Sequence, residues 1–367
     1  MSDKSGVFLG TAVVYCEGAL ATTWGKTAHG LVRHTDRFKV LSVVDSDQAG
    51  RDAGEVIGGA KLGIPVYPGV REAVHAATAS RSRPAYLVVG LAPDGGQLPT
   101  EARAAVKEAI ELGLNVCSGL HDFLSEDEEI STLAEAKGVD LMDVRKPPPR
   151  SQLHFFSGKI EEVTSLKIAV LGTDSAVGKR TTAAILVDAL RKAGKSAELV
   201  GTGQTSWMQG VRYSMILDSL VNDFVTGEIE HAVWSAWTDC SPDVILIEGQ
   251  GSLLNPAYPG GFEILAAARP DAIILQHAPA RKEYDGLPGY PLHPLETQMA
   301  ALELIGARPV IAITVNREGL DGPGADAVCQ GISASTGLPA CDVLRGGPGP
   351  ILGAIESRLL ELGGRPT

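Results

Sequence analysis

Short runs of apolar residues alternate with amphipathic segments along the whole chain. The runs are continuous rather than interrupted at every second residue, which is typical of strands buried on both faces of a helix-covered parallel sheet. Residues 100–113, TEARAAVKEAIELG, have a threonine cap, an acidic first turn and a closing glycine, and predict a helix between two such strands. The strands predicted in the first part of the chain are residues 11–16, 39–45, 85–90, 114–119 and 139–144.

A proline-rich stretch interrupts this pattern. Residues 143–153, DVRKPPPRSQL, contain three consecutive prolines, which exclude a helix and favour an extended connector. We therefore predict a Rossmann-like domain over residues 1–150 and a second α/β domain over 151–367. A small strand and a closing helix are expected in the last fifty residues. The other strands predicted after the connector are residues 166–172, 197–201, 243–249, 271–277 and 309–316.

A glycine-rich segment, LGTDSAVGKRTT at residues 171–182, leaves the first strand of the second domain and opens a helix. Backbone N–H groups, the helix dipole and Lys179 then point toward one place, which suits a phosphate. Five residues separate Gly172 from Gly178, whereas the usual loop has four. The longer form is also found in dethiobiotin synthetase. The segment predicts a parallel α/β domain of the P-loop NTPase type that resembles dethiobiotin synthetase; a glycine turn that binds nothing is the alternative.

The residue after the lysine departs from the usual loop. A serine or threonine normally stands there and its hydroxyl holds Mg²⁺, but this chain has Arg180, and Thr181 lies about 100° further around the helix. Arg180 adds a second cation whose fork suits a pair of phosphate oxygens. This change favours binding of a phosphorylated ligand over its cleavage, and we expect no obligatory metal.

Polar residues follow the predicted strands of the second domain, at the edge where parallel sheets bind ligands. Glu248 stands where P-loop enzymes carry a Walker B acid, although a structural role is the alternative. His277 ends the next strand and could be an ordinary strand-end histidine. Asn316 stands where related folds read a purine base, and asparagine is also a common turn former. Gln204, Gly251, Ser252, Arg281 and Lys282 are the other candidates at this edge.

Two regions give weaker signals. Asp223, in the predicted helix DSLVNDFVTGEIE, reaches a cleft only if the helix end borders it, and is otherwise a solvated acid. In the first domain, Lys26, Thr27 and His29 could bind an anion at the start of a helix, and Asp45 ends a strand where dinucleotide binders place a ribose acid. The G-x-G-x-x-G fingerprint is missing, so docking and dimerisation are favoured over NAD binding.

Composition narrows the classes of function. The net charge is −12 and no Lys/Arg-rich tract occurs, which argues against a nucleic-acid binder. No segment reaches the roughly 18 continuous apolar residues of a membrane span. The five cysteines are scattered without C-x-x-C spacing, which predicts neither a disulfide framework nor a zinc site. The short apolar run at the N-terminus is unlike a secretory signal, so a cytoplasmic protein is expected.

The segments KTAHGLVRH, VVDSDQAGRDAGEV, GTDSAVGKRTTA, GTGQTSWMQG and IEGQGSLLNPAYPG together are more specific than a P-loop alone. Across essentially the whole chain they resemble a P-loop family, long called a domain of unknown function, whose characterised members are D-glutamate N-acetyltransferases (DgcN). The resemblance implies acetyl transfer from acetyl-CoA to the amino group of D-glutamate. An ATP- and Mg²⁺-dependent ligase or kinase of the dethiobiotin synthetase type, or a non-catalytic nucleotide sensor, are the alternatives.

This reaction assigns expected roles. A general base has to take the ammonium proton, for which Glu248 or Asp223 is preferred over His277. Backbone N–H groups around Gly251 would stabilise the oxyanion, and Arg281 and Lys282 would hold carboxylates, with Gln204 and Ser252 nearby. A homo-oligomer, most simply a dimer, is expected. The residues predicted to bind acetyl-CoA are Gly172, Thr173, Asp174, Ser175, Gly178, Lys179, Arg180, Thr181 and Asn316.

Overall fold

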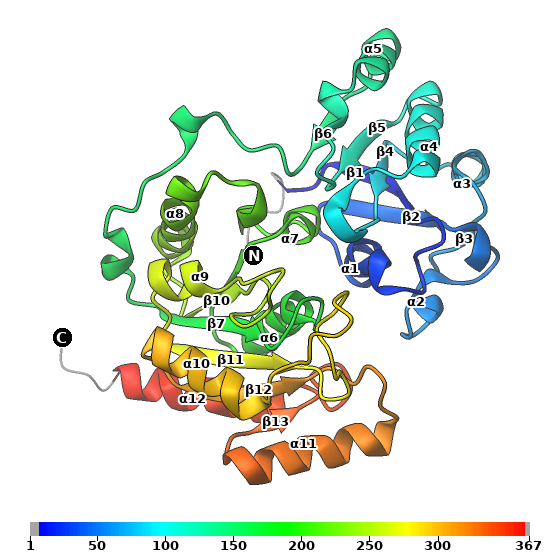
Figure 1. Ribbon diagram of the computed structural model, residues 1–367. Coiled ribbons are helices and arrows are strands. Elements are labelled where there is room, and N and C mark those ends of the chain that lie inside the picture. The colour runs from blue at the N-terminus through cyan, green and yellow to red at the C-terminus, as the bar shows by residue number, and fades with distance from the viewer. Residues whose placement is uncertain (1–6, 364–367) are drawn as a thin grey trace. The chain divides into compact units, whose positions relative to one another are not determined.

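The computed structural model describes residues 7–363, which divide into two compact units (Figure 1). Unit 1 contains residues 7–148 and 204–212, and unit 2 contains residues 149–203 and 213–363. The chain passes between units after Pro148, two residues before the predicted boundary. Segment 204–212, which the sequence placed in the second domain, belongs to unit 1.

Unit 1 is built around a parallel sheet of six strands in the order β3-β2-β1-β4-β5-β6, the order of Rossmann folds. All five predicted strands are confirmed within two residues, whereas the two-residue β3 is too short to leave a pattern in the sequence. The strands are β1 (Gly10–Tyr15), β2 (Phe38–Val44), β3 (Val66–Tyr67), β4 (Tyr86–Val89), β5 (Asn115–Ser118) and β6 (Leu141–Asp143). The helices are α1 (Lys26–Arg33), α2 (Ala53–Val56), α3 (Val70–Ala79), α4 (Thr100–Glu111), α5 (Glu128–Lys137) and α7 (Gln204–Met208).

Helix α7 joins unit 1 because its apolar and polar contacts are made there. Met208 is fully buried in the core of unit 1. The hydroxyls of Thr205 and Thr27, at the start of α1, lie 3.1 Å apart. A side chain at Gly119, just after β5, would come within 2.8 Å of Gln204 Cγ. Helix α7 therefore packs at the carboxyl edge of the sheet, the place where Rossmann folds bind dinucleotides.

Asp45, the acid at the end of β2, is used within unit 1. It is buried, and its carboxylate accepts hydrogen bonds from the backbone N–H groups of Leu20, at 2.9 Å, and Asp47, at 3.1 Å. Asp45 thus holds the loop that follows β1.

Unit 2 contains a parallel sheet of seven strands in the order β13-β12-β11-β7-β10-β8-β9. The five predicted strands are confirmed within one residue, and the short closing strand and helix are also present. The strands are β7 (Leu166–Gly172), β8 (Ala197–Gly201), β9 (Tyr213–Ser214), β10 (Val244–Glu248), β11 (Ala272–His277), β12 (Val310–Val315) and β13 (Ala340–Cys341). The helices are α6 (Lys179–Lys192), α8 (Asn222–Cys240), α9 (Phe262–Ala267), α10 (Leu295–Gly306), α11 (Gly322–Thr336) and α12 (Gly349–Gly363).

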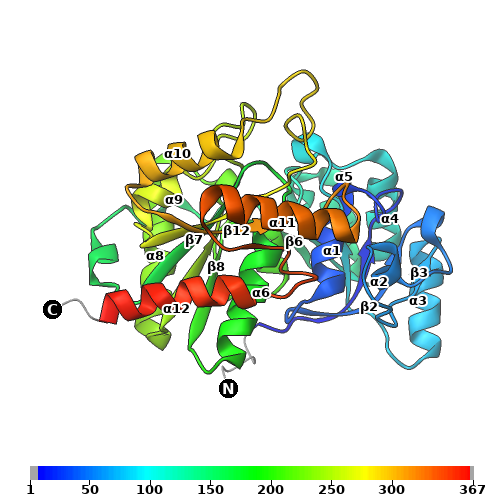
Figure 2. The same cartoon turned by 90° about the horizontal axis from the view of Figure 1, so that it is seen from below.

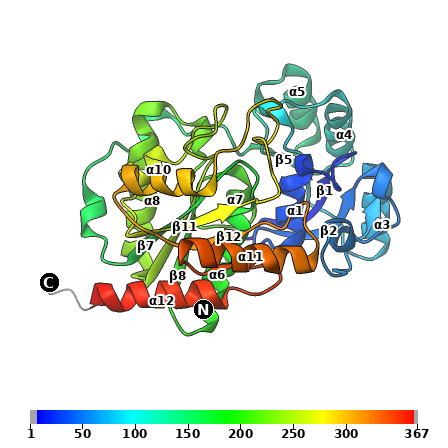
Figure 3. The ribbon, with the colours of Figure 1, turned by 60° about the horizontal axis from the view of Figure 1, so that its bottom comes forward.

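Helices cover both faces of this sheet, as its continuous apolar strands require. Helices α6 and α12 lie on one face, and α8, α9 and α10 on the other (Figures 2 and 3). Every residue of β7, β10 and β11 is buried, so β7 runs through the middle of the core. Among residues 7–363 we find no helix long and apolar enough to cross a membrane.

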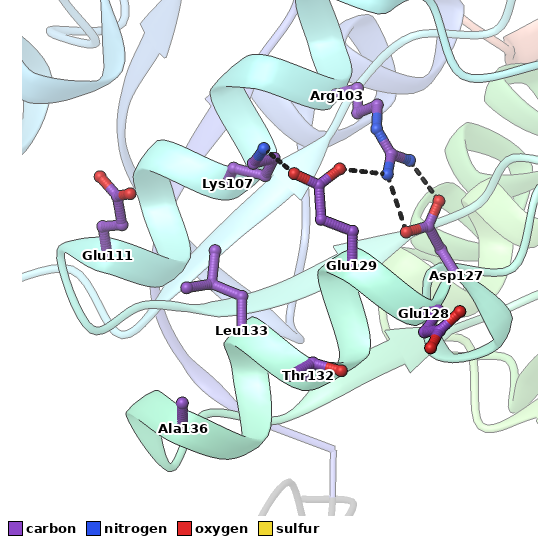
Figure 4. A pocket seen from close by; sticks show the side chains of 9 residues that line it. All are labelled: Arg103, Lys107, Glu111, Asp127, Glu128, Glu129, Thr132, Leu133 and Ala136. Atoms are coloured by element: carbon purple, nitrogen blue, oxygen red, sulfur yellow. Dashed lines mark hydrogen bonds and ion pairs between the residues drawn. The ribbon is translucent and has the colours of Figure 1, made fainter.

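A hollow of about 820 Å³ between α4 and α5 of unit 1 is lined mainly by charged residues. Arg103 donates to the carboxylates of Asp127 and Glu129, and Lys107 also contacts Glu129 (Figure 4). The hydrogen bonds from Arg103 lower the pKa of Asp127 to about 2. Because carboxylates of the protein already engage both cations, this hollow is a surface ion-pair network rather than an anion site.

Candidate functional site

The site is centred on the loop that follows β7. Strand β7 lies between β10 and β11, with Val170 level with Glu248 and Gly172 level with Gln276. Adjacent parallel strands end at the same edge, so Glu248 and His277, the last residues of β10 and β11, flank the loop. The prediction that the candidate residues converge at one sheet edge is confirmed for these positions.

The loop has the strand–loop–helix form that an anion cradle requires. Gly178 caps α6 with φ of 106°, a conformation that L side chains rarely adopt. A side chain on Gly172 would come within 2.9 Å of Lys179 Cδ, so Gly172 leaves room for the lysine to fold back. Lys179 is buried, and its Nζ donates at 2.8 Å to the carbonyls of both Asp174 and Gly251. The lysine therefore joins the loop after β7 to the loop after β10.

The carbonyl groups of the loop are held by side chains from several elements. Lys179 holds the carbonyl of Asp174, as described above for its Nζ. The carbonyl of Thr173 accepts a hydrogen bond from Gln298 Nε2 of α10 at 2.9 Å. Ser175 O accepts from Arg281 Nη1 at 2.7 Å. A further bond of 3.0 Å runs from the amide of Asn316 to the carbonyl of Val177. These bonds fix the peptide planes, which leaves the loop pre-organised for a ligand bound by N–H groups.

Asp174 is the central acceptor of the site. Its side chain is fully buried, and Oδ1 accepts from Ser175 N at 2.7 Å and Asn255 Nδ2 at 2.9 Å. Oδ2 accepts at 2.9 Å from both Arg281 Nη1 and Asp285 N. One carboxylate thus ties the P-loop to the loops after β10 and β11. In this structure Asp174 positions the loop through its side chain, a role that the motif did not indicate.

Glu248 is a buried carboxylate beside the P-loop strand. Its Oε2 accepts a 3.0 Å hydrogen bond from Thr202 N, just after β8. The hydroxyl of Thr202 donates to Glu248 O at 3.0 Å and accepts from Gln250 Nε2 at 2.9 Å. These contacts orient Glu248 at the ends of β8 and β10. An oriented, buried carboxylate at a sheet edge is suited to accepting a proton.

His277 is buried on the other side of β7. Its Nδ1 lies 3.0 Å from the hydroxyl of Thr173 in the P-loop. Burial lowers the pKa of His277 to about 4, although the charge of Glu296 acts in the opposite direction. His277 is therefore neutral near pH 7 and serves there as a hydrogen-bond partner rather than as a cation for a phosphate.

We expect this depressed pKa to make stability depend on pH. The unfolded histidine titrates near 6.5, so between about pH 4 and 6.5 the unfolded chain binds more protons than the folded one. The free energy of unfolding should then fall as the pH drops through this window, by about 3 kcal/mol for His277. Urea denaturation of wild-type protein and His277→Asn from pH 4 to 7 measures the difference. Exposed His75→Asn should keep the wild-type slope, and an unchanged slope in His277→Asn would contradict the assignment.

The remaining predicted residues fall into three groups. Arg180 and Thr181 are half-buried in the first turn of α6, next to the cradle. Ser252, after Gly251, is buried, and its hydroxyl finds no hydrogen-bond partner within residues 7–363. Lys282 is exposed beside Arg281, and Asp223 is exposed in the first turn of α8. Gln204 is the first residue of α7, in unit 1.

Two residues that organise the site were missed from the sequence. Asn255 lies in the motif IEGQGSLLNPAYPG but was not singled out, and it contacts Asp174. Gln298 is buried on the same face of α10 as Leu295 and Leu302. A glutamine at a core-facing helical position has to find a hydrogen-bond partner, and that was the signal available in the sequence.

Comparison with known proteins agrees with this architecture. Residues 154–352 match the family described as Domain of unknown function (DUF1611_C) P-loop domain, and residues 46–147 match its Rossmann-like N-terminal domain. A crystal structure of a DUF1611 family protein from Anabaena variabilis superposes with a TM-score of 0.86 at 28% identity, covering 95% of this chain and 99% of that one.

Two relatives carry a functional name. A D-glutamate N-acetyltransferase from Tritonibacter scottomollicae is 32% identical over 280 residues, which are 74% of this chain and 81% of the relative. Another from a Pseudoalteromonas species is 31% identical over 274 residues, covering 71% of this chain and 78% of the relative. The chain therefore belongs to the DUF1611 family, a family of two-domain P-loop proteins that includes these acyltransferase enzymes.

Proposed function

We propose that this protein transfers an acetyl group from acetyl-CoA to the amino group of D-glutamate, giving N-acetyl-D-glutamate and CoA. The observation that carries the proposal is the pairing of a pre-organised anion cradle with the buried carboxylate of Glu248, at the ends of the adjacent strands β7 and β10. The cradle suits the phosphates of CoA, and the carboxylate suits proton removal from an amine. The names of the two relatives supply the substrate.

The cradle is the proposed binding site for the donor. The N–H groups of Thr173 and Ser175 already donate to Gln276 O and Asp174 Oδ1. The other N–H groups of the loop up to Lys179, with the side chains of Lys179 and Arg180, would hold a phosphate group, and a phosphate oxygen would replace one of the carbonyls that Lys179 now contacts. Coenzyme A needs no cleavage of a phosphoanhydride. Arg180 stands where the usual loop has its magnesium-holding hydroxyl, which fits a ligand that is bound without being cleaved. Gly172, Asp174, Ser175, Thr181 and Asn316 complete the proposed cradle.

The acceptor is assigned to the loops after β10 and β11. Arg281 and Lys282 are proposed for the carboxylates of D-glutamate, and the buried hydroxyl of Ser252, which has no hydrogen-bond partner within residues 7–363, for a further polar contact. Glu248 would take the proton from the substrate ammonium, after which the nitrogen attacks the thioester carbonyl. The new C–N bond replaces the C–S bond, and the thiol leaves with CoA. Backbone N–H groups near Gly251 would stabilise the oxyanion. A homodimer remains a prediction, which a measurement of the molecular mass in solution would test.

The reaction can be measured by the release of CoA thiol. Purified protein, acetyl-CoA and D-glutamate should give thiol and N-acetyl-D-glutamate in equal amounts, in the presence or absence of a metal chelator. L-Glutamate tests the stereospecificity, glutarate, which has two carboxylates and no amine, is the negative control, and circular dichroism verifies folding. If folded protein released no thiol but hydrolysed ATP only with Mg²⁺, the ligase or kinase alternative would replace this proposal.

A further inference from the structure

The guanidinium of Arg281 has two edges with different partners. At the inner edge, Nη1 donates to Asp174 Oδ2 at 2.9 Å and to Ser175 O at 2.7 Å. At the outer edge, Nε and Nη2 donate to Glu318 Oε2 at 3.1 and 2.7 Å. The Arg281 side chain is only 9% exposed. The outer edge thus presents two parallel donors to a carboxylate, the arrangement that a carboxylate ligand would use.

The two partners differ in how firmly they are held. Asp174 is fully buried and has three donors besides Arg281, so the inner edge is fixed to the P-loop. Glu318 lies after β12 and its side chain is 47% exposed. Both outer donors of Arg281 converge on a single oxygen of Glu318, so the fork is not matched by two carboxylate oxygens. Glu318 is the exposed member of the pair, and Arg281 keeps the Asp174 carboxylate and the Ser175 carbonyl as partners when Glu318 leaves.

We propose that Glu318 is an internal substitute for a substrate carboxylate: it covers the outer edge of Arg281 and is displaced when the acidic amino acid binds. Glu318 thereby sets the affinity of the site for dicarboxylic acceptors. The bound carboxylate would place one oxygen on Nε and the other on Nη2, while Asp174 keeps the guanidinium in place. The inference rests on the proposed function in taking D-glutamate as the acceptor, whereas the Arg281 geometry suits carboxylates in general.

The test removes the competing charge and keeps the shape, with Glu318→Gln. Glutarate, which has two carboxylates and no amine to acetylate, is the binding probe, measured by calorimetry. We expect Glu318→Gln to bind glutarate about two- to fivefold more tightly than wild-type protein, because the substitution neutralises a competing carboxylate that is itself half-exposed to solvent. The KM for D-glutamate should fall by the same factor, with kcat and the KM for acetyl-CoA unchanged.

Glu361→Gln is the matched control, because Glu361 on α12 is also an exposed carboxylate paired with an arginine, Arg358. This control should leave the affinity for glutarate, kcat and both KM values unchanged. Unchanged or weaker glutarate binding in folded Glu318→Gln, or no glutarate binding to either protein, overturns the inference. Tighter glutarate binding without acetylation of D-glutamate would support the carboxylate site and refute the proposed function. Acetylation with an unaltered KM in Glu318→Gln would refute the inference alone.

Discussion

Lys179→Ala is expected to weaken the binding of CoA by about ten- to a hundredfold, since a charge-assisted hydrogen bond contributes about 1.5–3 kcal/mol. The lysine is buried in the first turn of α6, and its charge adds to the dipole of the helix N-terminus. Lys179 donates to the carbonyls of both Asp174 and Gly251, and within residues 7–363 no other side chain makes this pair of hydrogen bonds. Isothermal titration with CoA measures the loss directly.

The same substitution should also destabilise the protein, so binding and folding have to be measured separately. Two carbonyls would lose their donor, at a cost of about 1–3 kcal/mol for unsatisfied buried groups. Titration is therefore done at a temperature where circular dichroism shows both proteins folded. Lys192→Ala, an exposed lysine in the last turn of the same helix, is the control and should bind CoA like wild type. An unchanged dissociation constant in Lys179→Ala would refute the phosphate role of the loop.

The sequence predicted the strands of both sheets well because buried parallel strands are continuous apolar runs. It also placed the P-loop correctly, since its spacing and its strand–helix context are local properties. The two-residue strands β3 and β9 have no such pattern. The contacts that place helix α7 in unit 1, such as the burial of Met208, are tertiary and leave no local pattern in the sequence.

The candidate site was predicted less completely for a related reason. Strand ends indicated which residues gather at one edge, but not which of them bind each other. Arg281 and Asp174 were both expected to face ligands, and the structure shows them as partners in an ion pair. Asn316 was expected near a cofactor, and its amide holds the carbonyl of Val177. Such pairings join segments up to 139 residues apart and leave no periodic signal.

Glu248→Gln is expected to lower kcat by about 10²–10⁴-fold, the range for loss of a general base. Glutamine has nearly the same shape and can still accept the hydrogen bond from Thr202 N, so the loop after β8 should stay in place. It cannot take a proton from the substrate ammonium. The KM for acetyl-CoA should therefore change little, which steady-state kinetics with thiol detection can verify.

The pH dependence distinguishes a lost base from a disturbed site. Raising the pH increases the fraction of substrate with a free amine, so the deficit of Glu248→Gln should shrink as the pH rises, whereas a misplaced loop would lower the rate equally at every pH. Asp223→Asn is the matched control, because Asp223 is an exposed carboxylate in the first turn of α8. If Asp223→Asn lost activity and Glu248→Gln kept it, the base would be Asp223 and the start of α8 would border the reacting amine.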